Sequence, residues 1–285
     1  MRLPMAFSLL LLLPLLLVAA CSEPIAAGPA TAIDRRELAL RHQTNFLTEA
    51  GYTHLYAARS WPRRAWIAHR LRRAGYTHLY LYVMNENDYG GPAFNYYDSP
   101  GEFRAVLEEV HGKGLLPVVW LAPDDAPTLH RELPPTELMR IWDRFIPQVD
   151  DLVSSYVVGL EMDEYWRAGE YEQLGAHLGT LTERPIFVHM RPGLWEPALR
   201  PWCRGVVYQY GFGKSADEIE TVTRDLVPRL HAEGKIFIAG EYSVREPAAH
   251  AVALGDAALN AGADGFGNGG TPRWTAAAAG DSPGE

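Results

Sequence analysis

Short hydrophobic runs alternate along the chain with longer stretches in which apolar side chains recur at helical spacing. Such runs predict buried strands, and spacing at i, i+3, i+4 and i+7 predicts amphipathic helices. Strands that alternate with helices predict an α/β fold, here a single (β/α)8 TIM barrel. The predicted strands are residues 52–57, 77–83, 115–121, 156–162, 185–189, 205–210, 235–239 and 263–266, and the predicted helices between them are 64–73, 100–112, 135–149, 171–182, 216–232 and 247–261.

The start of the predicted barrel differs from a regular βα unit. After the eighth predicted strand the chain is too short to form a good helix, whereas the amphipathic stretch 33–50 precedes the first strand. We therefore expect this N-terminal helix to cover the gap between strands eight and one. The heptapeptide AGYTHLY at 50–56 recurs at 74–80. This spacing matches one βα unit and supports the placement of the two copies on successive strands.

The segment before the barrel has the pattern of a secretory signal peptide, because Arg2 precedes a leucine-rich core and small residues lead to Cys21. The run VAAC at 18–21 resembles the bacterial lipobox, which implies cleavage before Cys21 and its lipidation, with an ordinary signal peptidase site as the alternative. Ser22 after the cysteine favours the outer membrane of a Gram-negative cell, facing the periplasm or the cell surface. We expect a signal peptide at 1–20, a lipidated flexible tether at 21–32, the barrel at 33–274 and a disordered tail at 275–285.

Charge and cysteine content narrow the range of functions. Removal of residues 1–20 takes away one arginine and no acid, which leaves 25 basic and 35 acidic side chains. The chain has three lysines and lacks the clustered cations that nucleic-acid binding requires, so we expect no nucleic-acid partner. Lipidation of Cys21 leaves Cys203 without a second cysteine, which precludes an intrachain disulfide. We expect membrane contact through the lipid anchor only, and neither a cofactor nor a metal.

Acidic side chains gather where two predicted strands end. The fourth strand ends in Glu161, Asp163 and Glu164, and Glu241 follows the seventh. In TIM barrels the active site lies at the C-terminal ends of the strands. Neighbouring carboxylates disfavour each other's ionisation, which produces a proton donor close to neutral pH. These acids are therefore the predicted catalytic residues.

Alternation along each strand predicts which side chains face the barrel interior. The inward side chains are predicted to be Gly159, Glu161 and Asp163 on the fourth strand, His189 and Arg191 on the fifth, either Gln209 or the pair Tyr208 and Tyr210 on the sixth, and Phe237, Ala239 and Glu241 on the seventh. The side chains predicted to face the helices are Val158, Leu160 and Met162 on the fourth strand, and Ile236 and Ile238 on the seventh.

Aromatic, amide and carboxylate side chains follow the same strand ends. Sugars pack their apolar C–H faces on aromatic rings, and their hydroxyls bind polar groups. The pattern therefore predicts a carbohydrate cleft. The predicted substrate-binding residues are Asn85, Glu86, Trp120, Asp124, Tyr165, Trp166, His189, Arg191, Gln209, Tyr210, Tyr242 and Asn268.

The acids at the ends of the fourth and seventh strands resemble those of the large clan of TIM-barrel glycoside hydrolases. In that clan an Asn-Glu pair ends strand four, where the Glu is the acid/base, and a Glu that ends strand seven is the nucleophile. This sequence is similar at Asp163, Glu164 and Glu241. Asp163 stands where the clan has Asn, so Glu161 is the alternative to Glu164 as the acid.

The resemblance implies a lipid-anchored glycoside hydrolase that cleaves a polysaccharide by a two-carboxylate mechanism. Two other functions fit the same residues. One is a divalent-metal-dependent sugar isomerase or hydrolase, because Glu161, Asp163, His189 and Glu241 are ligand types that such cations accept. The other is a carbohydrate-binding surface lipoprotein without catalysis, because a barrel fold does not by itself establish activity.

Overall fold

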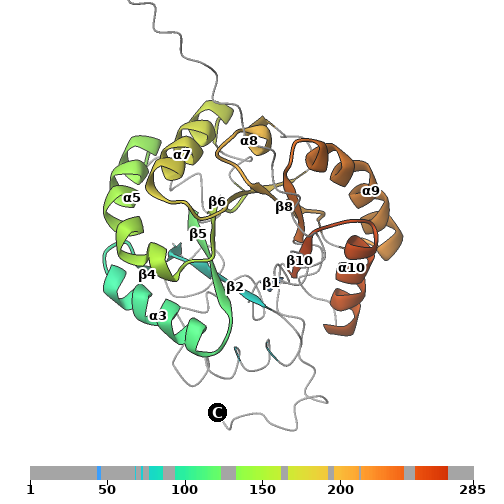
Figure 1. The fold of residues 1–285 in the computed structure, drawn as a ribbon, viewed down its shortest axis with the longest axis horizontal. Coiled ribbons are helices and arrows are strands. Elements are labelled where there is room, and N and C mark those ends of the chain that lie inside the picture. Colours follow the sequence, from blue (N-terminus) through green and yellow to red (C-terminus); the bar gives the residue numbers. More distant parts are fainter. Residues whose placement is uncertain are drawn as a thin grey trace, which may run out of the picture. The chain divides into compact units, whose positions relative to one another are not determined.

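The computed structural model describes residues 44–45, 68, 72, 77–85, 94–122, 133–161, 166–191, 196–211, 213–240 and 248–268. Their main sheet has eight parallel strands in the order β1-β10-β9-β8-β7-β6-β5-β2, with helices around it (Figure 1). β1 also lies beside β2, so the two ends of this order meet. The sheet is therefore curled on itself, and the predicted α/β TIM-barrel fold class is confirmed.

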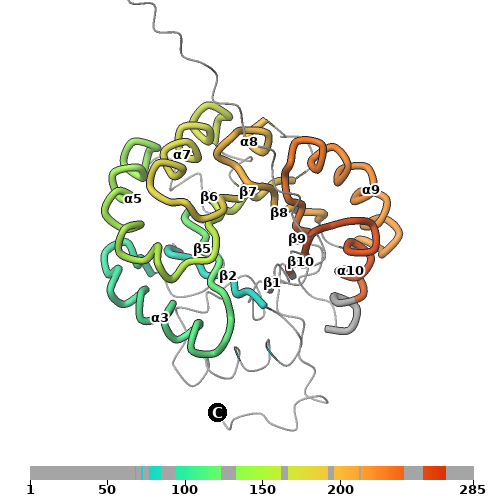
Figure 2. The backbone as a smooth tube through the Cα atoms, viewed as in Figure 1, coloured from blue at the N-terminus to red at the C-terminus, as the bar shows by residue number. Residues whose placement is uncertain are grey.

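Each strand of this sheet except β1 matches one predicted strand to within a few residues. Figure 2 shows the chain passing from each strand to an outer segment and back to the next strand. The strands are β1 (Thr44–Asn45), β2 (His78–Tyr82), β5 (Leu116–Ala122), β6 (Ser155–Gly159), β7 (Ile186–Met190), β8 (Gly205–Gln209), β9 (Ile236–Gly240) and β10 (Gly265–Asn268).

The helices begin and end where the sequence carries helix signals. The prediction is confirmed at both ends of α3 (Pro100–Gly112), α5 (Pro135–Val149) and α9 (Ala216–Ala232), and closely for α7 (Ala168–Leu181) and α10 (Ala248–Asn260). Proline starts α3 and α5, where its missing N–H has no intrahelical partner to lose. Ser215 and Glu218 form a capping box at the start of α9. None of the described helices is long and apolar enough to cross a membrane.

Buried side chains form two groups, one on each face of the sheet. Residues of the helices pack with alternate strand residues such as Leu81, Val119 and Val158 in the helix-side core. The second group, the interior cluster, has no helix residue among its buried members, so it fills the inside of the barrel. The interior cluster consists of Tyr80, Tyr82, Val118, Trp120, Val157, Leu160, Phe187, Val207, Ile236 and Ile238.

The predicted facing of the seventh strand is wrong. In β9, Phe237 and Ala239 belong to the helix-side core, and the Phe237 ring lies 5.4 Å from the Tyr208 ring. Ile236 and Ile238 belong to the interior cluster instead. Both faces of this strand are apolar and buried, as is usual in parallel sheets, so hydrophobicity does not distinguish them.

The N-terminal prediction needs one correction. Thr44 and Asn45 fall inside the predicted helix 33–50, yet they form β1 and pair with Gly267 and Asn268 of β10. Threonine and asparagine are poor helix formers, which explains why this point of the amphipathic pattern is extended. The predicted strand at 52–57 lies outside the described residues. So do the predicted signal peptide, the tether and the tail.

Two short features were absent from the prediction. β3 (Met84–Asn85) pairs antiparallel with β4 (Phe94–Asn95), and this small sheet follows directly from β2. Between β7 and β8 the outer element is α8 (Glu196–Leu199), which is a single turn. Elements of two to four residues are too short to produce a periodic hydrophobic pattern.

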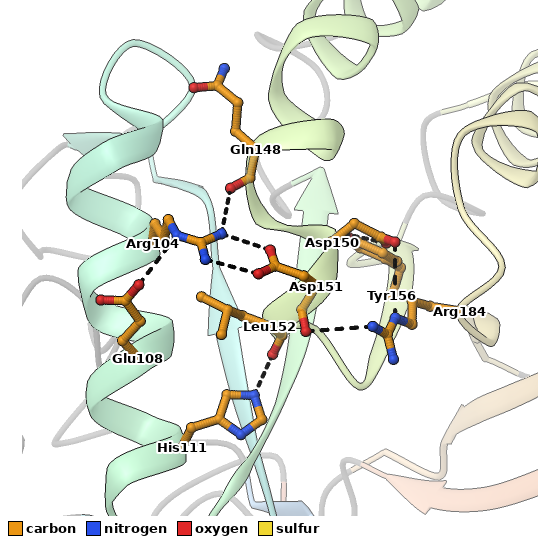
Figure 3. Close-up of polar contacts among 9 residues, drawn as sticks. All are labelled: Arg104, Glu108, His111, Gln148, Asp150, Asp151, Leu152, Tyr156 and Arg184. Carbon is orange, nitrogen blue, oxygen red and sulfur yellow. Dashed lines mark hydrogen bonds and ion pairs between the residues drawn. The ribbon is translucent and has the colours of Figure 1, made fainter.

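A polar network lies at the N-terminal ends of β6 and β7 (Figure 3). Arg104 of α3 forms a bidentate pair with Asp151 of the 3-10 turn η2 (Asp150–Leu152), with atom distances of 2.6 and 2.8 Å. Asp150 accepts a hydrogen bond from Thr182 at 2.5 Å and one from Tyr156 at 3.2 Å. These bonds tie α3, η2 and the starts of two strands together, at the end of the barrel opposite the strand C-termini.

Candidate functional site

Glu161 lies two residues beyond the C-terminal end of β6 and has an unusual backbone. Its φ is +47°, and it is the only residue other than glycine with a positive φ among those that the structure describes. A left-handed conformation costs on the order of 1–3 kcal/mol for such a residue, and residues of this kind cluster at functional sites. The turn also moves Leu160 into the interior cluster, so its predicted helix-facing position is wrong.

Two side chains from the next strands bind Glu161. Its backbone N–H donates to Nδ1 of His189 at 3.0 Å, and its Oε1 accepts a short hydrogen bond from Nε2 of Gln209. His189 lies in β7 and Gln209 is the last residue of β8. The structure thus brings three predicted site residues together at the C-terminal ends of three neighbouring strands.

The His189 ring is completely buried and its tautomer follows from its contacts. Because Nδ1 accepts a hydrogen bond from a backbone N–H, it carries no proton, and the proton of the neutral ring sits on Nε2. The ring packs edge-on against Trp120, with centroids 5.1 Å apart and planes at 62°. These contacts fix the position of the imidazole and the tautomer of its neutral form.

An aromatic wall continues from His189 across the barrel interior. The Trp120 ring of β5 stacks on Tyr82 at 5.4 Å and lies 5.3 Å from Tyr80, both of β2. Trp120 was a predicted substrate-binding residue, whereas the two tyrosines were not. The signal for them is the alternation of leucine and tyrosine in HLYLY at 78–82, in which Leu79 and Leu81 pack on the helix side.

The structure decides between the alternatives for the sixth predicted strand. Tyr208 and Tyr210 lie in the helix-side core, and the Tyr210 hydroxyl bonds to Thr223 of α9 at 2.6 Å. Burial raises the pKa of Tyr208 to about 12 and that of Tyr210 further, so both phenols are neutral. Gln209 therefore faces the interior, and the prediction that Tyr210 binds substrate there is wrong.

Other predicted binding residues lie in different surroundings. Trp166, a predicted substrate-binding residue, is buried in the helix-side core. A bulky ring after a strand end packs on the nearest apolar surface, here that of the helices. Arg191 is exposed directly after β7. The backbones of Asn85 and Asn268 end β3 and β10.

The remaining predicted site residues stay predictions, because they lie outside the described residues. In the part of the chain that the structure describes, no three His, Cys, Asp or Glu side chains are grouped as metal ligands would be. The residues outside it are the predicted acids Asp163, Glu164 and Glu241, the predicted binding residues Glu86, Asp124, Tyr165 and Tyr242, and the predicted lipidation site Cys21.

A pocket of about 390 Å³ lies elsewhere, between the outer face of β8 and the start of α9. It is not part of the strand-end site, because none of the predicted acids lines it. Its lining residues are Tyr208, Tyr210, Lys214, Asp217, Glu218, Thr221 and Val222.

Comparison with known proteins identifies structural neighbours. No protein-family model matches the chain, and no curated protein is similar in sequence. A family 5 glycoside hydrolase from Bacteroides vulgatus has a TM-score of 0.59 at 13% identity, over 74% of this chain and 55% of that one. A GH53 catalytic domain from Ignisphaera aggregans has a TM-score of 0.54 at 12% identity, over 81% and 84%. A GH113 β-mannanase from Alicyclobacillus acidocaldarius has a TM-score of 0.52 at 13% identity, over 80% and 85%.

These neighbours are glycoside hydrolases, and at such low identity the likeness shows a shared fold. The predicted resemblance to TIM-barrel glycoside hydrolases is therefore supported at the level of the fold. Substrate and mechanism have to be argued from the site itself.

Proposed function

We propose that this chain is a glycoside hydrolase that cleaves a glycosidic bond of a polysaccharide with two carboxylates. The observation that carries the proposal is Glu161, held in a strained turn at the C-terminal end of β6 by His189 and Gln209. Barrel enzymes place their reactive groups at this end of the strands. The glycoside hydrolases among the structural neighbours support the same class of reaction.

Glycosidic cleavage requires one carboxyl group that donates a proton to the leaving oxygen and one that is ionised. We assign the first role to Glu161 in preference to Glu164, because its carboxyl group is held by Gln209 of β8. Glu241 is the ionised partner in this proposal. It lies outside the described residues, and its assignment rests on its position directly after β9 and on the resemblance at this strand end, not on the facing predicted for that strand. Asp163 and Glu164 follow Glu161 in the sequence and supply the negative charge that favours a protonated carboxyl group.

A buried set of aromatic rings supports the site next to Glu161. Trp120, Tyr80 and Tyr82 form a continuous set of rings that reaches His189, which in turn bonds Glu161. Trp120 and Tyr80 are buried, so these rings fix the position of His189 and do not themselves contact a sugar. The proposed substrate class, a polysaccharide, rests on the aromatic and amide side chains that the sequence places at the strand ends and on the glycoside hydrolases among the structural neighbours.

The first experiment compares wild type with Glu241→Gln on a panel of polysaccharides and aryl glycosides. The substitution preserves shape and removes the ionised carboxylate, so we expect a loss of about three or more orders of magnitude in kcat with little change in KM. Hydrolysis that the variant retains in full would contradict the proposal. Glycan binding without turnover would favour the carbohydrate-binding alternative, and turnover that follows added divalent cation would favour the metal-dependent one.

The lipid anchor is a separate part of the proposal and rests on the VAAC run at 18–21. Replacement of Cys21 with Ala removes the thiol that would carry the lipid. We expect metabolic palmitate labelling of wild type and none of the variant. A wild-type protein that incorporates no palmitate would show that the segment is an ordinary signal peptide.

A further inference from the structure

We propose that His189 and Gln209 are positioning residues that clamp Glu161 from two sides, and that neither is a substrate contact. His189 holds the backbone of Glu161 and Gln209 holds its carboxyl group. The inference deepens the proposed function, because it assigns these two residues to the acid of the same site. It also replaces the sequence prediction that both bind substrate.

The His189 side of the clamp acts on the strained backbone. A positive φ at a glutamate is stable only where surrounding contacts hold it. The 3.0 Å bond from the Glu161 N–H to Nδ1 of His189 is such a contact, and it comes from a different strand. The imidazole cannot move away, because it is completely buried and packed edge-on against Trp120.

The Gln209 side of the clamp acts on the carboxyl group. An amide carries a donor and an acceptor, whereas lysine and arginine carry donors only. Nε2 of Gln209 donates to ionised Glu161, and rotation of the amide presents its oxygen to the protonated carboxyl group. That oxygen is buried and has no hydrogen-bond partner among the described residues. Gln209 thus fits both protonation states of an acid that gives up a proton and regains it.

The surroundings of His189 and Gln209 show why we assign them a positioning role and not a contact with the substrate. His189 has no exposed surface, so a sugar does not reach it without displacing Trp120 or Glu161. Gln209 is partly exposed, but its Nε2 donates to Glu161 and its Oε1 is buried. Both residues therefore act on the substrate only through the carboxyl group that they hold.

The His189 contact is tested by the unfolding temperatures of the full-length His189→Asn and His189→Leu variants. The asparagine amide oxygen takes the place of Nδ1 as acceptor but leaves a cavity, whereas leucine fills the space and leaves the Glu161 N–H without an acceptor. The clamp predicts a lower Tm for His189→Leu than for His189→Asn. Packing alone predicts the opposite order, and that order would overturn this half of the proposal.

The Gln209 contact is tested by Gln209→Met, which keeps the length of the side chain and removes both polar atoms. We expect kcat to fall about tenfold or more on substrates with poor leaving groups and far less on dinitrophenyl glycosides, with KM nearly unchanged, because only the former need the proton. Tyr210→Phe, at the residue directly after β8, is the matched control. It loses the bond to Thr223 on the helix side and is expected to affect both substrates by the same factor. An equal loss on both substrates for Gln209→Met would contradict a positioning role.

A double-mutant cycle tests the hydrogen bond between Gln209 and Glu161 through Tm alone, without a measurement of activity. The Tm changes of Gln209→Met and Glu161→Met are expected to be non-additive in the double variant, because each single change removes one partner of the same hydrogen bond. If the wild type cleaves no glycoside but the cycle shows coupling, the proposed function fails and the clamp stands. Additive changes would overturn the clamp even in an active enzyme.

Discussion

At the scale of single residues, polar side chains at strand ends were more predictable than the aromatic ones that follow the strands. Glu161 and His189 were predicted to face inward and Gln209 was one of two alternatives, and the structure joins these three residues by hydrogen bonds. Tyr210 and Trp166 instead pack against the helices. A carboxylate or amide has few buried positions where its hydrogen bonds are satisfied, whereas an aromatic ring is stable on either face of a barrel strand.

A leaving-group comparison tests which strand-end acid gives the proton. We expect Glu161→Gln to slow glycosides with poor leaving groups by a factor on the order of 100 or more, and to slow dinitrophenyl glycosides much less. Glu164→Gln is the matched variant three positions along the chain, and it is expected to affect the two substrates equally. If Glu164→Gln shows the selective loss and Glu161→Gln does not, the acid is Glu164. The measurement is kcat/KM of both variants on each class of glycoside.

At the scale of elements, the helices followed from the sequence more closely than the strands did. Prolines and the Ser215 capping box mark where α3, α5 and α9 begin, and both ends of these three helices match the prediction. The sequence did not predict which side chains of β9 face the barrel interior, because both faces of this strand are apolar. The pair β3 and β4 was not predicted. It is defined by contacts between two strands, and the hydrophobic pattern along the sequence does not contain such contacts.

The close approach of β8 and β9 gives a stability prediction. A methyl group on Gly205 would lie 2.2 Å from the carbonyl oxygen of Ile236, so Gly205→Ala forces the two strands apart. We expect a loss of about 1–3 kcal/mol in the free energy of unfolding, measured by chemical denaturation. Gly101→Ala in the first turn of α3 is the control, because a methyl group there meets no atom within 4 Å. The control is expected to gain about 0.5–1 kcal/mol. A Gly205→Ala protein as stable as wild type would contradict the strand packing.

At the scale of the whole barrel, the proposed function gives the two ends of the strands different roles. The C-terminal ends of β6, β7 and β8 carry the strained Glu161 and its clamp. The N-terminal ends carry the network of Arg104, Asp150 and Asp151, which links outer helices to strand starts (Figure 3). This division is the one expected of a barrel enzyme, with reactivity at one end and stability at the other.

The pH dependence of unfolding tests the stabilising end. The hydrogen bond and charge of Arg104 lower the pKa of Asp151 below its ordinary value. A carboxyl group whose pKa is lower in the folded state stabilises the fold above its unfolded pKa, which is about 3.9, and loses that effect as the pH falls through the folded pKa. Asp151→Asn is therefore expected to lower Tm at neutral pH and to flatten the fall of Tm below about pH 4. Parallel Tm curves for variant and wild type would contradict the pairing.

The central claim is that two carboxyl groups face each other across the mouth of this barrel. The most direct measurement is the distance between the carboxyl groups of Glu161 and Glu241 in a crystal structure of the protein. The two-carboxylate mechanism predicts about 5 Å for a retaining enzyme or about 6.5–9.5 Å for an inverting one. A separation well beyond about 10 Å, or a Glu241 side chain directed away from the barrel interior, would contradict the claim.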